Sequence, residues 1–214
     1  GAMGKDTLSS YMEERFANGG IVNINNGLIE YSVNNGIIYG WGGGIVVTNG
    51  TQGVIRYCKN NGSLLKSAYD TRKGSPLNWK FYYPNDLART NVGLIINSIY
   101  TTSIVEYNEA EAYENSVYVG VNKGVIRNSF GKTSYYLNNV EISSSVEKMQ
   151  TDQFAWILNT TNGSEENSGV WTRGTDGYPT FANKDSLAIR KVVFNDDGTT
   201  TNRYTNYKGQ VSFP

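Results

Sequence analysis

The chain has 214 residues, with 24 glycines, 16 tyrosines, one cysteine, no histidine, and 19 basic and 19 acidic side chains. This length suits one domain with a sizeable core, and the balanced charge argues against nucleic acid or an acidic membrane as the main partner. A single cysteine excludes an intrachain disulfide, and no apolar run is long enough to insert into a membrane. Without histidine, Ser-His-Asp and Cys-His catalysis and the usual zinc sites are removed, so we expect no metal and no cofactor.

The first residues are expected to lie outside the main fold. Gly1–Gly4 is typical of the scar left when a purification tag is removed. Ser10 and Glu13 form a capping-box pattern, which predicts a short helix ending near Gly19. Residues 5–19 are therefore interpreted as an N-terminal cap over the open end of the fold, or else as the frayed remains of an earlier repeat.

One stretch occurs twice and organises the rest of the chain. Residues 20–36 read GIVNINNGLIEYSVNNG, and residues 44–62 read GIVVTNGTQGVIRYCKNNG. A spacing of roughly 25 residues is typical of solenoid repeats. Two short strands joined by Gly/Asn corners form one coil, which buries too little apolar surface alone and is stabilised by stacking on its neighbours.

The same pattern returns further along the chain. Val92–Ile96 with Ser103–Tyr107 resembles a third coil, and Tyr118–Gly124 with Val125–Gly131 resembles a fourth. The triplet Val-Ile-Arg that opens the last segment also occurs at Val54–Arg56. We therefore predict an all-β fold, a short parallel β-helix of about four coils over residues 20–142.

An insertion over residues 69–91 interrupts the coils. Pro76, Pro84 and a basic cluster around Arg72 cannot continue a hydrogen-bonded ladder, so this stretch is predicted to be a loop extending from one corner. Long insertions on a rigid scaffold are common places for function.

The remaining chain is not repetitive. Ser144 and Glu147 form a second capping box, and the following apolar residues share one helical face, which predicts an amphipathic helix against the last coil. Residues 143–187 are thus expected to be a helix and a capping segment that covers the open ladder. Residues 188–214 are expected to form a β-hairpin around an Asp-Gly turn.

A resemblance to known repeats adds to this interpretation. The repeat, with Tyr57–Gly62 as its nearest match and Ser32 in place of cysteine in the first unit, resembles the GLUG-type Gly/Asn-rich β-helix repeats of surface proteins of gut and other anaerobic bacteria. Phe154–Phe181 looks like the segment that closes such arrays, and Lys191–Pro214 is similar to the opening of a Listeria-Bacteroides repeat. The resemblance implies right-handed coils, a location outside the cell or on the bacterial surface, and adhesion without a named ligand.

Carboxylates offer the remaining route to catalysis. Four acidic side chains cluster in one irregular stretch, namely Glu106, Glu109, Glu111 and Glu114. Arg56 and Arg127 are predicted to stack on a neighbouring face. Glycosidases use paired carboxylates, and β-helix lyases use acidic residues with calcium and a basic residue, so a polysaccharide lyase or glycoside hydrolase is one alternative. Cys58 is predicted to be a small buried core residue.

Aromatic residues in the breaks between coils are the stronger indication of a site. An exposed ring packs against a sugar face or anchors a protein interface, although the same rings can instead be buried when the loop folds back. The predicted ligand-binding residues are Trp41, Arg72, Trp79, Phe81, Tyr82 and Tyr83.

The sequence thus predicts a non-catalytic surface module that binds a glycan or a protein of the host or cell surface. A purely structural spacer is the second alternative, and the oligomeric state is left open.

Overall fold

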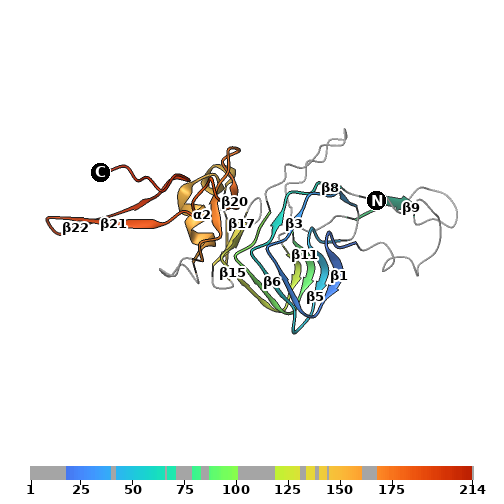
Figure 1. Ribbon diagram of the computed structural model, residues 1–214. Helices are drawn as coiled ribbons and strands as arrows, with labels where there is room; N and C mark the ends of the chain where they lie inside the picture. Colours follow the sequence, from blue (N-terminus) through green and yellow to red (C-terminus); the bar gives the residue numbers. More distant parts are fainter. Residues whose placement is uncertain are drawn as a thin grey trace.

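The structure is a computed structural model that describes residues 18–39, 42–65, 67–70, 79–82, 87–100, 119–130, 134–137, 140–143, 145–160 and 168–213 (Figure 1). Most ordered elements are β-strands and only two short helices occur among these residues, so the all-β prediction is confirmed. The Trp41 and Arg72 positions, the acidic cluster at 106–114 and the expected cap at 5–17 lie outside the described residues.

Three parallel sheets dominate the first part of the chain. The first contains β1 (Val22–Asn25), β5 (Val46–Asn49), β11 (Ala88–Asn91) and β14 (Val119–Asn122). The second contains β2 (Leu28–Glu30), β6 (Val54–Arg56), β12 (Leu94–Ile96) and β15 (Val125–Arg127). The third contains β3 (Val33–Asn34), β7 (Lys59–Asn60), β13 (Ile99–Tyr100) and β16 (Ser129–Phe130). A shorter parallel pair joins β4 (Ile38–Tyr39) to β8 (Leu64–Leu65).

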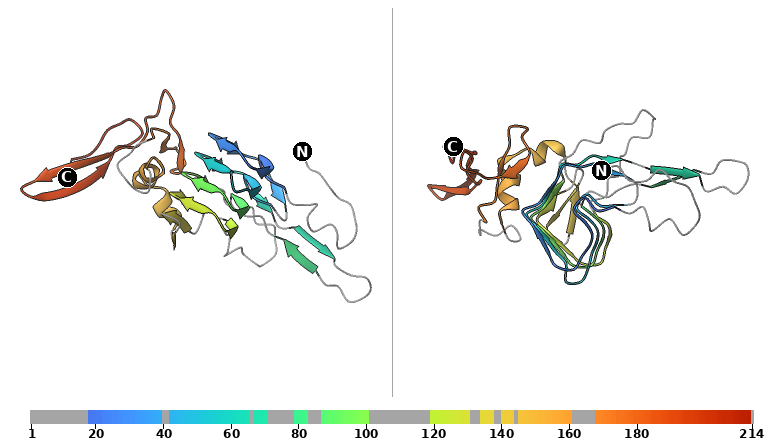
Figure 2. Two further views of the ribbon diagram at one scale, coloured as in Figure 1. Left: turned by 90° about the horizontal axis from the view of Figure 1, so that it is seen from below. Right: turned by 45° about the vertical axis from the view of Figure 1, so that its right-hand side comes forward.

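Four successive passes of the chain each contribute one strand to each of these three sheets. We call them layer 1 (residues 18–39), layer 2 (42–65), layer 3 (87–100) and layer 4 (119–130). Figure 2 shows the layers following one another as parallel steps. The two repeats recognised in the sequence are layers 1 and 2, and Asn34 is aligned with Asn60 as expected.

Equivalent residues form columns that run through the layers. One column aligns Ile29, Ile55, Ile95 and Ile126, and the last three are fully buried. These isoleucines belong to the main hydrophobic cluster together with Cys58, which is also fully buried as predicted. Since each layer alone buries little apolar surface, the core exists only because the column is continuous.

A second column is made of asparagines. The Nδ2 atom of Asn25 donates to Asn49 Oδ1 at 2.8 Å, Asn49 donates to Asn91 at 2.8 Å, and Asn91 donates to Asn122 at 2.9 Å. In the third sheet, Asn34 donates to the side chain of Asn60 at 2.9 Å. Each buried amide is thus satisfied by its counterpart in the next layer, which makes the register of the layers costly to change.

The corner between the second and third sheets differs from the prediction. At this corner the left-handed residue is Tyr31, Tyr57, Asn97 or Asn128 in the four layers, with φ between 42° and 51°. Glycine and asparagine were expected at the corners, and tyrosine fills the position in layers 1 and 2. The backbone shape is imposed by the neighbouring layers, whose hydrogen bonds outweigh the local preference of the residue.

The insertion between layers 2 and 3 contains an antiparallel pair, β9 (Ser67–Asp70) and β10 (Trp79–Tyr82). After it, the chain returns to the stack at β11. The third strand of layer 3 is Ile99–Tyr100, whereas Ser103–Tyr107, which the repeat pattern had favoured, lies outside the described residues.

Beyond layer 4 the third sheet continues with antiparallel strands β17 (Ser134–Leu137) and β18 (Val140–Ser143). The amphipathic segment that follows forms two helices, α1 (Val146–Met149) and α2 (Asp152–Leu158), in place of the single predicted helix. Thr151 separates them, because its extended backbone and its side-chain bond from Phe154 N start a new helix.

Residues 145–160 and 168–213 form what we call the C-terminal unit. It contains α1, α2, an antiparallel pair β19 (Trp171–Arg173) and β20 (Pro179–Phe181), and a hairpin of β21 (Lys191–Asp196) and β22 (Thr199–Tyr204). Asp197 and Gly198 turn the hairpin with φ of 41° and 83°. The views in Figures 1 and 2 place this hairpin and the β9–β10 pair at opposite ends of the molecule.

The C-terminal unit packs along the side of the stack. Ile99 of layer 3 and Phe130 of layer 4 form one buried cluster with Phe154, Leu158 and Trp171. Tyr57 of layer 2 packs against the same cluster. The buried cluster that joins the C-terminal unit to the stack therefore includes residues of layers 2, 3 and 4.

Candidate functional site

The aromatic site predicted from the sequence falls mainly on the insertion. Trp79, Phe81 and Tyr82 lie within four residues of β10. The other predicted site residues, Trp41, Arg72 and Tyr83, lie outside the described residues. The structure therefore brings three of the six onto one short strand.

The backbone of β9 and β10 shows how these positions are presented. Trp79 is aligned with Asp70 and Tyr82 with Ser67 across an antiparallel ribbon. Because successive positions of a strand alternate between its faces, positions 79 and 81 share one face of the ribbon. Among the described strands, β9 and β10 pair only with each other. The predicted loop thus contains an ordered ribbon that projects from a regular stack (Figure 1).

A second aromatic feature was missed by the sequence analysis. The rings of Tyr31 and Tyr57 stack with centroids 5.3 Å apart and planes inclined by 15°. Tyr31 is 56% exposed, because it belongs to layer 1 and, among the described residues, has a column neighbour on one side only. The alignment of the two repeats already places these tyrosines at equivalent positions, so the signal was available in the sequence.

Charged residues flank this tyrosine pair. The Nη2 atom of Arg56 lies 2.6 Å from Glu30 Oε2, and its Cζ atom lies 5.9 Å from the centre of the Tyr57 ring. The hydrogen bond that Arg56 donates to Glu30 raises the pKa of Arg56 above its ordinary value. Arg127 shares the column of Arg56 as predicted, but Ile96 lies between them. The two guanidinium groups are thus two layers apart, about 10 Å by strand spacing, and do not form one cluster.

Lys59 lies buried where layer 2 meets the C-terminal unit. Its Nζ atom donates to the backbone oxygen of Pro179 at 2.9 Å, and its side chain is 5% exposed. Burial lowers the pKa of Lys59, and the negative charge of Asp176 partly opposes this change. This single bond ties the stack to β20, so Lys59 serves the docking of the C-terminal unit.

Side-chain amides of the stack also hold the C-terminal unit. Asn97 Nδ2 donates to the backbone oxygens of Leu158 and Thr160, and Asn128 Nδ2 donates to the oxygen of Thr160 at 2.7 Å. The ring nitrogen of Trp171 donates a hydrogen bond to the backbone oxygen of Asn97 at 3.2 Å. The left-handed corner therefore exposes Tyr31 in layer 1 and half-buries Tyr57 in layer 2, whereas in layers 3 and 4 it anchors the C-terminal unit.

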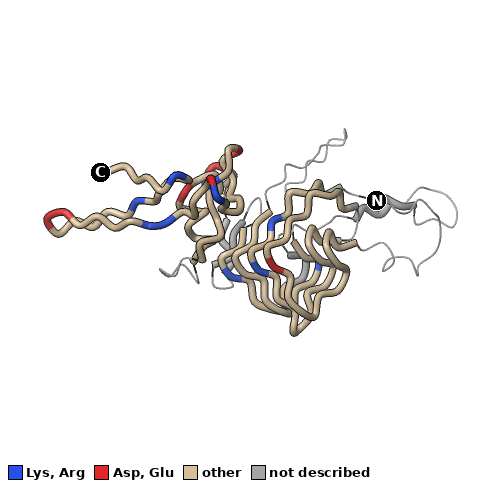
Figure 3. The backbone as a smooth tube through the Cα atoms, viewed as in Figure 1, with Lys and Arg blue, Asp and Glu red and all other residues tan. Residues whose placement is uncertain are grey.

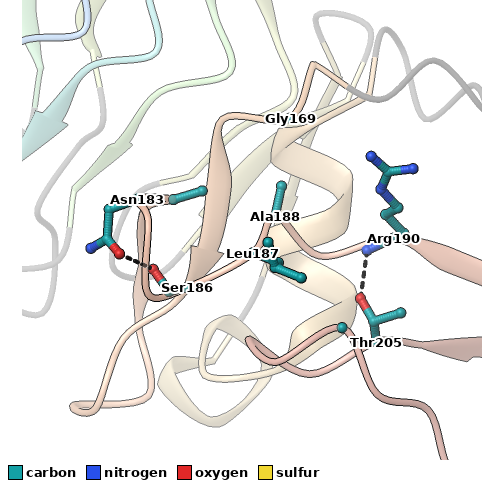
Figure 4. Close-up of a pocket in the computed structure, with 9 residues that line it drawn as sticks. Gly169, Asn183, Ser186, Leu187, Ala188, Arg190 and Thr205 are labelled. Carbon is teal, nitrogen blue, oxygen red and sulfur yellow. Dashed lines mark hydrogen bonds between the residues drawn. The ribbon is translucent and has the colours of Figure 1, made fainter.

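A shallow depression of about 520 Å³ lies within the C-terminal unit (Figure 4). Leu187 and Ala188 form its centre, and Asn183, Ser186 and Thr205 stand at its edges. The polar edge groups are engaged internally: Ser186 Oγ donates to Asn183 Oδ1 at 3.0 Å, and the backbone nitrogen of Arg190 donates to Thr205 Oγ1 at 2.9 Å. These groups stabilise the fold of the unit and do not converge on a common point.

Charge is sparse over the stacked layers, and acidic residues mark the tip of the β21–β22 hairpin (Figure 3). Within the described part of the chain, no group of three acidic or cysteine side chains is placed to hold a metal ion. In the same part, no helix has the length and apolar character needed to cross a membrane.

Comparison with known protein families, with curated proteins and with solved structures found no match to this chain.

Proposed function

We propose that this chain is a non-catalytic binding module of a secreted or cell-surface bacterial protein, built on a short right-handed β-helix. Its ligand is a glycan or a surface protein, bound by the β10 ribbon through Trp79, Phe81 and Tyr82. The observation that carries the proposal is the position of three aromatic residues on a ribbon that projects from the stack.

The stack supports this role because it resists deformation. The asparagine and isoleucine columns fix the register of each layer against the next, so the layers on either side of the insertion have a constant position. Aromatic rings carried on rigid elements lose little conformational freedom on binding, which favours affinity for planar sugar faces.

The test is an array of glycans and extracellular-matrix proteins probed with the wild-type chain and with a Trp79→Ala/Tyr82→Ala variant. Tyr207→Ala is the matched control, because Tyr207 is an exposed aromatic residue on the C-terminal unit. We expect selective binding that the double variant loses and the control retains. Equal binding by all three proteins would refute a site on β10.

A structural spacer is the second candidate, favoured by the continuity of the columns over four layers. A spacer binds nothing on the array, and its stability is unchanged by the β10 substitutions. Binding by the wild-type protein and by the Tyr207→Ala control, lost in the double variant, therefore separates the two functions.

A further inference from the structure

The layer-1 end of the stack exposes apolar residues that the other layers bury. Ile21 and Val22 are 44% and 38% exposed, whereas Ile45 and Val46, which are aligned with them in layer 2, are fully buried. Strands β1, β2 and β3 are the terminal strands of their three sheets on this side. The described residues thus leave three strand edges and an apolar face uncovered at one end.

Gly27 gives independent information about this end. A glycine precedes the second strand in every layer, at Gly27, Gly53, Gly93 and Gly124. A Cβ atom on Gly53 would lie 2.6 Å from Asn25 O, one on Gly93 would lie 2.1 Å from Gly53 O, and one on Gly124 would lie 2.2 Å from Gly93 O. In these layers glycine is required because the backbone of the preceding layer fills the space.

Among the described residues, none fills the same space at Gly27. A Cβ atom there would meet nothing within 4 Å, and Gly27 is not among the described glycines with positive φ. Neither crowding nor backbone conformation within the described residues therefore requires glycine at this position. A carbonyl oxygen placed as in layers 2–4 would supply the missing reason.

The asparagine columns are incomplete at the same end. Asn49 Oδ1 accepts from Asn25 and Asn60 Oδ1 accepts from Asn34, each across a layer boundary. For Asn25 and Asn34 the bonds to Oδ1 come from Gly27 N and Gly36 N, within their own layer. Each of these two oxygens retains capacity for a donor arriving from outside the stack.

From these observations we propose that the layer-1 end is a docking surface for one further layer of the same Gly/Asn repeat. The partner is a strand-turn-strand segment that pairs in parallel with β1, β2 and β3. It carries asparagines that donate to Asn25 and Asn34, aliphatic residues over Ile21 and Val22, and a backbone carbonyl over Gly27. This proposal is independent of the ligand proposed for β10.

Residues 1–17 differ in composition from such a segment. Residues 1–17 contain no asparagine. They therefore lack the donor side chains of a further layer.

The experiment adds the missing layer to the full chain. Residues 18–41 are duplicated in tandem before Asn18, so that the added layer is connected as layer 1 is connected to layer 2. A matched control carries Asn25→Leu and Asn34→Leu in the added copy only. Gly27→Ala is then introduced into the original copy of both the natural and the duplicated chain, and Gly53→Ala serves as the reference for a crowded site.

We expect the duplication to raise the thermal midpoint by about 5 °C or more and the leucine control to lose most of that gain. Gly27→Ala is expected to shift the thermal midpoint of the natural chain by less than about 2 °C and to lower that of the duplicated chain by about 5 °C.

Three results would overturn the proposal. If Gly27→Ala lowers the thermal midpoint of the natural chain as much as Gly53→Ala does, residues 1–17 already fill the space. A concentration-dependent dimer of the natural chain that Gly27→Ala disrupts would identify a second copy as the occupant. An unchanged midpoint on duplication, with Gly27→Ala still harmless, would show that the surface accepts no layer.

Discussion

The stacked layers and the C-terminal unit both bury asparagine side chains, yet they satisfy them in different ways. In the stack, Asn49 binds its own counterparts, Asn25 and Asn91, in the layers on either side. In the C-terminal unit, Asn159 is a single hub that accepts from Ser168 Oγ, Val170 N and Trp171 N and donates to the oxygens of Trp171 and Ile189. The stabilising hydrogen bonds of the column are shared among several equivalent asparagines, whereas those of the hub all depend on Asn159.

The largest expected effect comes from interrupting the column. Asn49→Ala leaves the Asn25 amide and the Asn91 oxygen without their partner in the column, and it also removes bonds to the oxygens of Gly53 and Leu94. Since each unsatisfied buried group costs about 1–3 kcal/mol, we expect a loss of about 4 kcal/mol in the free energy of unfolding. Urea denaturation measures it.

Asn35→Ala is the control for that substitution, because Asn35 is exposed and accepts one bond from Asn61. Its effect should stay within about 0.5 kcal/mol. Equal losses at Asn49 and Asn35 would contradict the importance of the column.

Replacement of Asn159 should cost nearly as much stability as replacement of Asn49, but its effect should be confined to the C-terminal unit. Asn159→Ala leaves Val170 N and Trp171 N without an acceptor, and we expect a loss of about 3 kcal/mol. Hydrogen exchange should accelerate in residues 145–160 and 168–213 while the amides of layers 2 and 3 remain protected. Equal acceleration in the layers would mean that the two regions unfold as one unit.

The pH dependence of stability tests the burial of Cys58 inside the stack. Burial raises the pKa of this thiol from 9.0 to about 11. Below pH 9 the folded and unfolded states both hold the proton, and the full stability is present. As the pH rises toward 11, the unfolded thiol ionises first, so about 2 kcal/mol of stability is lost.

Cys58→Ser isolates this contribution, because the equivalent residues Ser32, Ser98 and Ser129 show that the position accepts serine. We expect the wild-type protein to lose more stability than the variant between pH 8.5 and 10.5, as followed by urea denaturation at each pH. Parallel pH curves would show that the thiol ionises normally in the folded state.

The smallest expected effect is at the surface of the stack. Arg56→Ala removes the ion pair with Glu30 beside the stacked tyrosines, and the Arg56 side chain is 43% exposed. Such pairs contribute about 0.2–1 kcal/mol and are screened by salt, so the loss should be below about 1 kcal/mol and shrink in 1 M NaCl. A salt-independent loss would indicate packing of the arginine stem against Tyr57.

Three of the six predicted site residues lie within the described part of the chain. Trp79, Phe81 and Tyr82 stood out by composition, but only strand pairing shows that they belong to a ribbon. The Tyr31–Tyr57 stack was overlooked although the repeats place both tyrosines at equivalent positions, because tyrosine does not favour the left-handed backbone of this corner. Local propensity carries little information where neighbouring layers dictate the conformation.

The sequence by itself determined the layers. The equivalent positions of Asn25 and Asn49 in the two repeats, and of Ile29 and Ile55, encode their contacts directly, because in a stack each residue meets its own counterpart. Only the tertiary structure decided where the C-terminal unit lies and where its helix breaks. Its contacts, such as those of Lys59 with Pro179 and of Trp171 with Asn97, join unlike residues far apart in the chain. The repeat pattern does not predict such contacts.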